Sequence, residues 1–289
     1  MRALRCSAAP SGRTTWTPNL SPRLPAVSLS GERHVTYDAR GLAEPHAEVP
    51  KVSKINGEKA TFDAGPLTTR QINLELRWLL YEQGVKDVTV RNPGAKHSLG
   101  VGILTRCKLR FEGSLGYFGL GVIDGPEITV TGRVGWSVCE NMMSGVVVIE
   151  KNAGSLTAAA MRGGDLVVKG SVGARTGIDQ KGGTVIVCGD AGMNTGFMLQ
   201  RGRQIICGNV GPNLGDSMYD GTIYVGGKVK SLGLDCVPGE WTDADTELIE
   251  RKFRIYGLGT PPKFQKFVCG KVLYNYDALE PSERKLMIH

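Results

Sequence analysis

Cysteine and histidine are among the side chains of this 289-residue chain that could bind a metal, attack a substrate or carry a proton. Its 7 cysteines include no Cys-x-x-Cys pair, which argues against a structural zinc site, and their odd number argues against a closed disulfide framework. Cys188 and Cys207 stand nineteen positions apart, a spacing that recurs along the chain and that predicts two small residues stacked in a ladder. A reducing cytosol is the simplest setting for these thiols.

The histidines and the glycine-rich stretches give no catalytic pattern either. The glycine-rich stretch 113–121 resembles a phosphate-binding loop, but a strand follows it where a helix is required. The histidines are scattered and have no partner at a catalytic spacing. They are His34, His46, His97 and His289. The residues therefore predict a scaffold with no catalytic residue, no cofactor site and no metal site of its own.

The net charge of +7 does not indicate a nucleic-acid-binding protein. Four arginines precede the first acid, Glu32, so the N-terminal segment alone supplies much of the excess. No basic helix, aromatic stacking platform or known binding module accompanies it. No apolar run reaches the roughly 18 residues that a membrane span needs, which predicts a soluble, cytoplasmic protein.

A repeat of nineteen residues positions His97 and four of the seven cysteines. The repeat runs from 94 to 233, and most of its rows begin with a glycine that is followed by a second glycine three positions later. A fixed period of this length with short β-branched strands is typical of a solenoid. The sequence therefore predicts an all-β fold, a single-stranded right-handed parallel β-helix of about seven to eight coils over 94–240. The row anchors are Gly94, Gly113, Gly132, Lys151, Gly170, Gly189, Gly208 and Gly227.

Side-chain alternation within each row predicts which residues face the interior of the solenoid. Positions fifteen and seventeen after the anchor are almost all apolar, so they should point inward. Position ten should add a further inner column. That column is Leu104, Ile123, Met142, Met161, Gln180, Leu199 and Met218.

Position sixteen should face outward, yet it is apolar over five consecutive coils. With strands about 4.8 Å apart, these residues would form an apolar stripe roughly 19 Å long. A stripe of this kind indicates a surface that is covered, either by a terminal segment of the same chain or by a partner protein. Its members are Val148, Val167, Ile186, Ile205 and Tyr224.

The segments outside the repeat are interpreted as a tail and two caps. Residues 1–50 are predicted to be a disordered or wrapping tail; their composition also suits an organellar transit peptide, which is the less favoured interpretation. Within 51–93 we expect a strand at 60–62 and a helix that starts at a Thr68–Gln71 capping box, ends at Gly84 and closes the first coil. Within 241–289 we expect a helix over 242–256 and a basic, aromatic tail over 261–276 that packs on the outside of the solenoid or inserts into a neighbour.

Several residue strings resemble a known family. They are Asn92-Pro93-Gly94 with His97 and Gly102; Gly116-Tyr117; Glu140-Asn141-Met142-Met143-Ser144-Gly145; Gly215-Asp216-Ser217 with Tyr219; Lys230-Ser231-Leu232-Gly233 with Asp235-Cys236; and Leu273-Tyr274-Asn275-Tyr276. Together with the glycine repeat, they resemble the GXGXG β-helix found in the glutamate synthase large subunit and in the β-helical chain of formylmethanofuran dehydrogenase. Within that family the chain is most similar to stand-alone subunits of the N-methylglutamate synthase B type.

The resemblance implies a subunit of an enzyme complex for methylamine metabolism and glutamate biosynthesis. One partner would resemble a class II glutamine amidotransferase, and another would carry FMN and iron–sulfur clusters, so this chain would hold neither cofactor. The complex would convert glutamate and methylamine to N-methylglutamate and ammonia, with this chain holding the catalytic subunits together and walling the path of ammonia or amine. No catalytic residue carries over to this chain.

Candidate interface or tunnel residues lie on the outer stripe and at the unusual corners. They are Val148, Val167, Ile186, Ile205, Tyr224, His97, Tyr117, Asn141, Met143, Lys230 and Asp235. Three alternatives remain open: the β-helix subunit of an ordinary glutamate synthase, the β-helical chain of a formylmethanofuran dehydrogenase or formyltransferase–hydrolase complex, and a free-standing β-helical binding protein.

Overall fold

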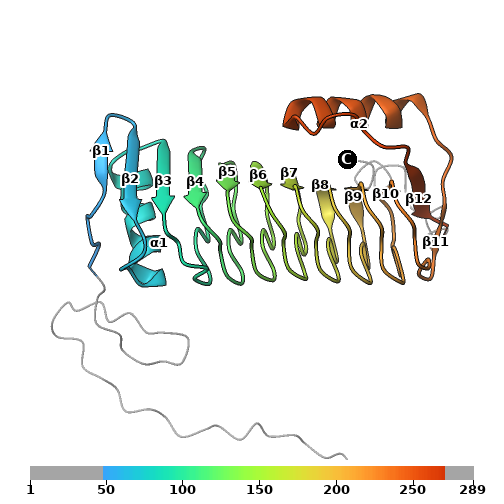
Figure 1. Ribbon diagram of the computed structural model, residues 1–289, viewed down its shortest axis with the longest axis horizontal. Coiled ribbons are helices and arrows are strands. Elements are labelled where there is room, and N and C mark those ends of the chain that lie inside the picture. The colour runs from blue at the N-terminus through green and yellow to red at the C-terminus, as the bar shows by residue number, and fades with distance from the viewer. Residues whose placement is uncertain (1–47, 271–289) are drawn as a thin grey trace, which may run out of the picture. The chain divides into compact units, whose positions relative to one another are not determined.

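The computed structural model describes residues 48–270, which form a stack of short strands in one sheet (Figure 1). Adjacent strands from β2 to β10 are parallel, so each coil returns on the far side before it adds its next strand. This arrangement confirms the predicted all-β solenoid. In sheet order, the strands are β1 (Lys54–Asn56), β2 (Lys59–Asp63), β3 (Asp87–Arg91), β4 (Lys108–Glu112), β5 (Glu127–Val130), β6 (Val146–Ile149), β7 (Asp165–Val168), β8 (Lys181–Val187), β9 (Arg201–Ile206), β10 (Thr222–Val225), β12 (Gln265–Cys269) and β11 (Cys236–Pro238).

The register confirms the nineteen-residue period from β4 onward but not in the first coil. Leu109 lies opposite Ile128, nineteen positions later, and the same step recurs up to β10. Val88, however, lies opposite Leu109, so the coil between β3 and β4 has 21 residues. The inward placement predicted for Leu104 is therefore wrong, and this side chain is 60% exposed. Ile103 is buried in its place, and its carbonyl accepts from Asp124 as the carbonyl of Ile123 accepts from Met143.

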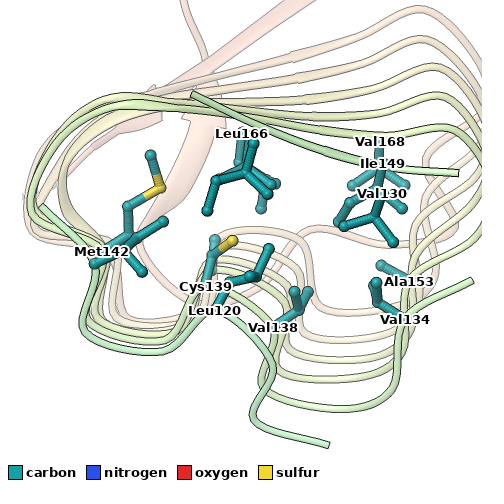
Figure 2. Close-up of a cluster of buried hydrophobic side chains, with 14 of the residues drawn as sticks. Leu120, Val130, Val134, Val138, Cys139, Met142, Ile149, Ala153, Leu166 and Val168 are labelled. Carbon is teal, nitrogen blue, oxygen red and sulfur yellow. The ribbon is translucent and has the colours of Figure 1, made fainter. Parts of the chain in front are cut away.

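The interior of the solenoid is filled by columns of apolar side chains, as predicted. Figure 2 shows Val130, Ile149 and Val168 from successive strands stacked along one side, with Val134 and Ala153 across from them. All three strand residues are fully buried. In-register stacking of like side chains gives each coil the same cross-section, so the core continues without a break from one coil to the next.

Two glutamines interrupt the apolar columns and meet each other. Gln180 and Gln204 are both fully buried, and the Gln204 Nε2 donates to the Gln180 Oε1 at 3.0 Å. The Gln180 Nε2 in turn donates to the carbonyl of Gly182 at 2.9 Å. A hydrogen-bonded pair avoids most of the cost of burying two amides. Gly177 leaves the room for this pair, because a Cβ at that position would lie 2.0 Å from the Gln204 Nε2.

The side of each coil opposite the sheet is also ordered by hydrogen bonds between coils. Phe118 donates its N–H to the carbonyl of Trp136, and Cys139 donates to Gly119. Alternate residues on this side adopt positive φ, as at Ser137, Cys139 and Asn141 in one coil, and the pattern recurs down the solenoid. Large side chains such as Phe118, Leu120 and Arg175 adopt this conformation too, so it does not set residue size. The seventh position is buried, and a Cβ at Gly196 would lie 2.6 Å from the Ile223 side chain, so packing in the core explains why it is small from Cys139 onward.

The N-terminal end is closed as predicted. Helix α1 (Thr69–Arg77) begins at the Thr68–Gln71 capping box, continues into a π-helical turn (Trp78–Glu82), and stops before Gly84 at φ +66°. Its fully buried face joins the core of the first coil. Strand β1 was not predicted, although the Asn-Gly turn that joins it to β2 is a strong hairpin signal.

The C-terminal region extends the sheet. Helix α2 (Asp243–Tyr256) has Thr242 as its N-cap and ends at Gly257 with φ +61°, which confirms the predicted bounds. The tail predicted to lie on the outside of the solenoid instead forms β12, which pairs antiparallel with both β10 and β11. The residues of this predicted tail beyond Gly270 lie outside the described residues, as do residues 1–47.

The Gly177 site gives a test of the interior. Replacing Gly177 by alanine should cost about 2–5 kcal/mol of unfolding free energy, because it combines a left-handed backbone with a clash against Gln204. The matched control is Ala158→Gly, since Ala158 occupies the same position one coil earlier at φ +59° and should change stability by about 1 kcal/mol or less. Urea unfolding of both variants measures the difference, and equal losses would contradict the assigned packing.

Candidate functional site

The outer apolar stripe is covered by helix α2 of the same chain. Figure 1 shows α2 running along the stack over the C-terminal strands. Its 14 residues span about 21 Å, which matches the roughly 19 Å from Val148 to Tyr224. Ile249 and Phe253 of α2, together with Phe264, form one buried cluster with the stripe. The stripe and the helix therefore have matching lengths.

The structure thus decides between the two coverings that the sequence left open. Val167, Ile186, Ile205 and Tyr224 are at most 2% exposed under the chain's own helix. Of the two expected coverings, the terminal segment of the same chain lies over these four residues, so they are not accessible to a partner in the folded chain. Val148 differs because it is only partly buried at the edge of the cluster.

Two carboxylates fasten α2 to the sheet, each through one tyrosine and one lysine. Asp245 of α2 accepts from the Tyr224 Oη at 2.6 Å and from the Lys266 Nζ at 2.9 Å. Asp165 of β7 accepts from the Lys252 Nζ at 2.6 Å and from the Tyr256 Oη. Neither acid is evident from the sequence, because each depends on a residue far along the chain.

The two carboxylate sites perturb the titration of their members. Burial by itself would raise the pKa of Asp245, but hydrogen bonds from Lys266, Tyr224 and Thr242 outweigh burial and hold that pKa well below its ordinary value. Burial, and then the bond to Asp245, raises the pKa of Tyr224. Burial, and then the bond to Asp165, raises the pKa of Tyr256 in the same way. Asp245 is therefore a carboxylate held ionised by its hydrogen-bond partners.

The N-terminal half of the same sheet face is polar and carries exposed ion pairs. Lys108 pairs with Glu127 across β4 and β5, and Lys59 pairs with Asp87 across β2 and β3. Along position sixteen the residues change from polar, at Arg110 and Thr129, to apolar at Val148, where the coverage by α2 begins. The length of the covered surface is encoded in this one column.

Three aromatic rings stack at one exposed corner of the first coils. The rings of His97 and Tyr117 lie 4.6 Å apart at 14°, and those of Tyr117 and Trp136 lie 5.3 Å apart at 22°. The Tyr117 N–H also donates to the His97 Nδ1 at 2.9 Å. Tyr117 is 50% and Trp136 55% exposed. The structure thus brings together His97 and Tyr117, which were both predicted as candidate interface residues. It adds Trp136, which could have been identified from the sequence because it lies nineteen positions after Tyr117.

Asn141 and Met143 lie on a second corner. Asn141 has φ +54° and donates its N–H to the carbonyl of Ala159, so its backbone is part of the inter-coil ladder. Met143 is 44% exposed, and Val122, which belongs to the preceding coil, is 41% exposed. Met143 therefore offers an apolar contact, whereas Asn141 serves the turn.

Lys230 and Asp235 belong to the last, partial coil. This segment stacks on the previous coil, because Asn213 donates its N–H to the Ser231 Oγ and Leu234 donates its N–H to the Asp216 Oδ1. Lys230 is exposed and lines an open groove of about 560 Å³. Asp235, at φ +69°, accepts from the N–H of Gly270 and joins this coil to β12. The groove residues are Asp190, Ala191, Asn209, Val210, Gly211, Lys228, Val229 and Lys230.

The described residues include one exposed feature that suits binding, the stacked rings of His97, Tyr117 and Trp136. Between residues 48 and 270, no three histidine, cysteine or acidic side chains are placed to hold a metal ion. No helix in that range is both long and apolar enough to cross a membrane. Exposed stacked rings on a rigid solenoid corner, by contrast, are a feature that protein interfaces use.

The structure places the chain within the parallel β-solenoid class. No family model matches the sequence. Protein GlxC of Rhizobium meliloti (strain 1021) is 48% identical over 221 residues, which cover 74% of this chain and 95% of GlxC. The chain belongs to the GlxC family. This relationship supports the resemblance to glutamate synthase-like subunits.

The Asp245 carboxylate in the first turn of α2 predicts that the stability of the fold depends on pH. Because the pKa of Asp245 is lower in the folded than in the unfolded chain, its contribution to stability is complete above the unfolded value, near pH 4, and is lost as the pH falls below that. At neutral pH, Asp245→Asn should cost about 3 kcal/mol of unfolding free energy. This difference from the wild type should shrink in acid.

The control for this prediction lies on the same helix. Asp243 is exposed in the first turn of α2, so Asp243→Asn should change the unfolding free energy by about 0.5 kcal/mol at most. Urea unfolding across the acid range measures all three proteins. A deficit of Asp245→Asn that stays constant down to strong acid would refute the assignment.

Proposed function

We propose that this chain is a non-catalytic β-helix subunit of a glutamate synthase-like multisubunit flavoenzyme, of the N-methylglutamate synthase type. The family relationship, which covers 95% of GlxC, is the observation that carries the proposal. The family-like strings around His97, Tyr117 and Met143 support it, because they supply exposed side chains at the corners of the solenoid.

In this role the chain holds two catalytic partner subunits at a fixed distance and orientation to each other. One is a class II glutamine amidotransferase-like subunit, and the other carries FMN and iron–sulfur clusters. A solenoid suits the task because its coils are nearly identical in cross-section and resist bending, so partners bound at different corners keep their separation. Its corners would also wall the path of ammonia or methylamine between the active sites.

The overall reaction would convert glutamate and methylamine to N-methylglutamate and ammonia. An ordinary glutamate synthase and a formylmethanofuran dehydrogenase-type complex remain the alternatives, each with the same β-helix and different partners. The partner proteins distinguish them, since the formylmethanofuran complex would include a metallohydrolase.

Co-purification tests the proposal. The tagged full chain, recovered from its native cells, should bring down a flavin protein and an amidotransferase-like protein, identified by absorbance and mass spectrometry. The purified complex should consume methylamine in preference to glutamine plus 2-oxoglutarate. Recovery of the chain alone would overturn the proposal, and a metallohydrolase partner would establish the formylmethanofuran alternative.

The aromatic corner gives a sharper prediction. Trp136→Ala combined with Tyr117→Ala should reduce recovery of at least one partner about tenfold or more, since interface aromatic residues often contribute 2 kcal/mol or more each. Met193→Ala is the control, because Met193 is an equally exposed apolar residue, at 47%, on a later coil of the solenoid. Thermal unfolding of the free chains should differ little, and equal recovery with both variants would exclude the corner as an interface.

A further inference from the structure

Cys188 and Cys207 are neighbours on the outer surface of the sheet. Each follows directly on the last residue of its strand, and those residues, Val187 and Ile206, lie opposite each other in the parallel register of β8 and β9. The Cys207 N–H donates to the carbonyl of Val187, so the ladder continues to this point. Both cysteines are partly exposed. The structure thus places the two cysteines one coil above the other, as the sequence predicted.

The two thiols interact directly. A hydrogen bond from Cys207 to Cys188, opposed by burial and assisted by the charge of Lys169, lowers the pKa of Cys188. The same hydrogen bond, with burial, raises the pKa of Cys207. One thiol is thus favoured as the thiolate while its neighbour keeps its proton, which is the arrangement that thiol–disulfide exchange uses.

The spacing of the strands allows a disulfide but strains it. Neighbouring strands lie about 4.8 Å apart, within the Cα separation of about 4.4–6.8 Å that a disulfide spans. Parallel in-register side chains keep nearly that same separation at Cβ, however, whereas a relaxed disulfide brings the Cβ atoms to about 3.8 Å. The bond would therefore form with strain and be readily reduced again, as reversible disulfides are.

We infer that Cys188 and Cys207 form a dithiol site that small disulfides oxidise reversibly to a bond between β8 and β9. In the first step the Cys188 thiolate attacks one sulfur of a disulfide such as oxidised glutathione, and one glutathione thiolate leaves with the electron pair. Cys207 then loses its proton, attacks the Cys188 sulfur and expels the second glutathione. The protein loses two electrons and two protons, and the oxidant gains them as two thiols.

Another pair of cysteines in the chain provides an internal comparison. Cys236 of β11 lies directly opposite Cys269 of β12, so proximity alone would favour a disulfide there as well. Burial raises the pKa of Cys236 to about 11, however, which leaves little thiolate at neutral pH. The inference therefore depends on thiolate character and access in addition to distance, and it does not depend on the proposed enzyme complex.

The experiment treats the reduced full chain with oxidised glutathione, blocks remaining thiols with N-ethylmaleimide and maps the peptides by mass spectrometry. We expect Cys188 and Cys207 to be lost together from the alkylated pool as a cross-linked peptide, and to return on treatment with reduced glutathione. The single variants Cys188→Ser and Cys207→Ser should abolish the cross-link. They should leave the alkylation of Cys236 unchanged.

Three outcomes would overturn the inference. They are no cross-link after oxidation, a stable glutathione adduct on Cys188 with Cys207 still alkylated, and a cross-link between Cys236 and Cys269 instead. Lys169→Gln adds a rate test, because removal of its charge should slow alkylation of Cys188 several-fold. Lys228→Gln is the matched control, since Lys228 lines the groove beyond the cysteine column, and it should leave the rate unchanged.

Discussion

The close stacking of one coil on the next is the constraint on which the rest of the structure depends. Each coil must lie about one strand spacing from its neighbours along its whole circumference, on the loop side as well as in the sheet. A Cβ at Gly132 would come within 2.4 Å of the backbone of Gly113, so side chains are excluded where the coils approach most closely. The glycine-rich rows and the like-on-like core columns both follow from this distance.

A solenoid built in this way has a long flat face, and the chain uses half of it for itself. The covering helix buries apolar surface and at the same time carries charged anchors at both of its ends. An ion pair that is nearly buried is costly to form and costlier to break, so its main effect is to fix position. Asp165 and Asp245 thus set where along the stack the helix lies, whereas the apolar stripe supplies the attraction.

The sequence predicted the solenoid, both helices and most of the interior, because these depend on short-range periodicity and local capping. It failed where a single coil departed from the period. Two additional residues before β4 moved Leu104 out of the core, and nothing in an otherwise regular repeat announces such an insertion. It also left open what covers the stripe, since the residues that do so lie far along the chain. Trp136 could have been found by extending the spacing from Tyr117, whereas Asp165 and Asp245 could not, because their partners are defined only by the docking of α2.

Near both ends of the sheet the strand direction reverses. β1 is antiparallel to β2, and β12 is antiparallel to both β10 and β11. A parallel coil at an open end would present the template on which an identical molecule could add, and successive additions would grow a fibre. β1 at one end and the short β12–β11 pair at the other interrupt the regular parallel coils and offer no such match. The chain therefore has a defined length, and assemblies that include it can be finite in size.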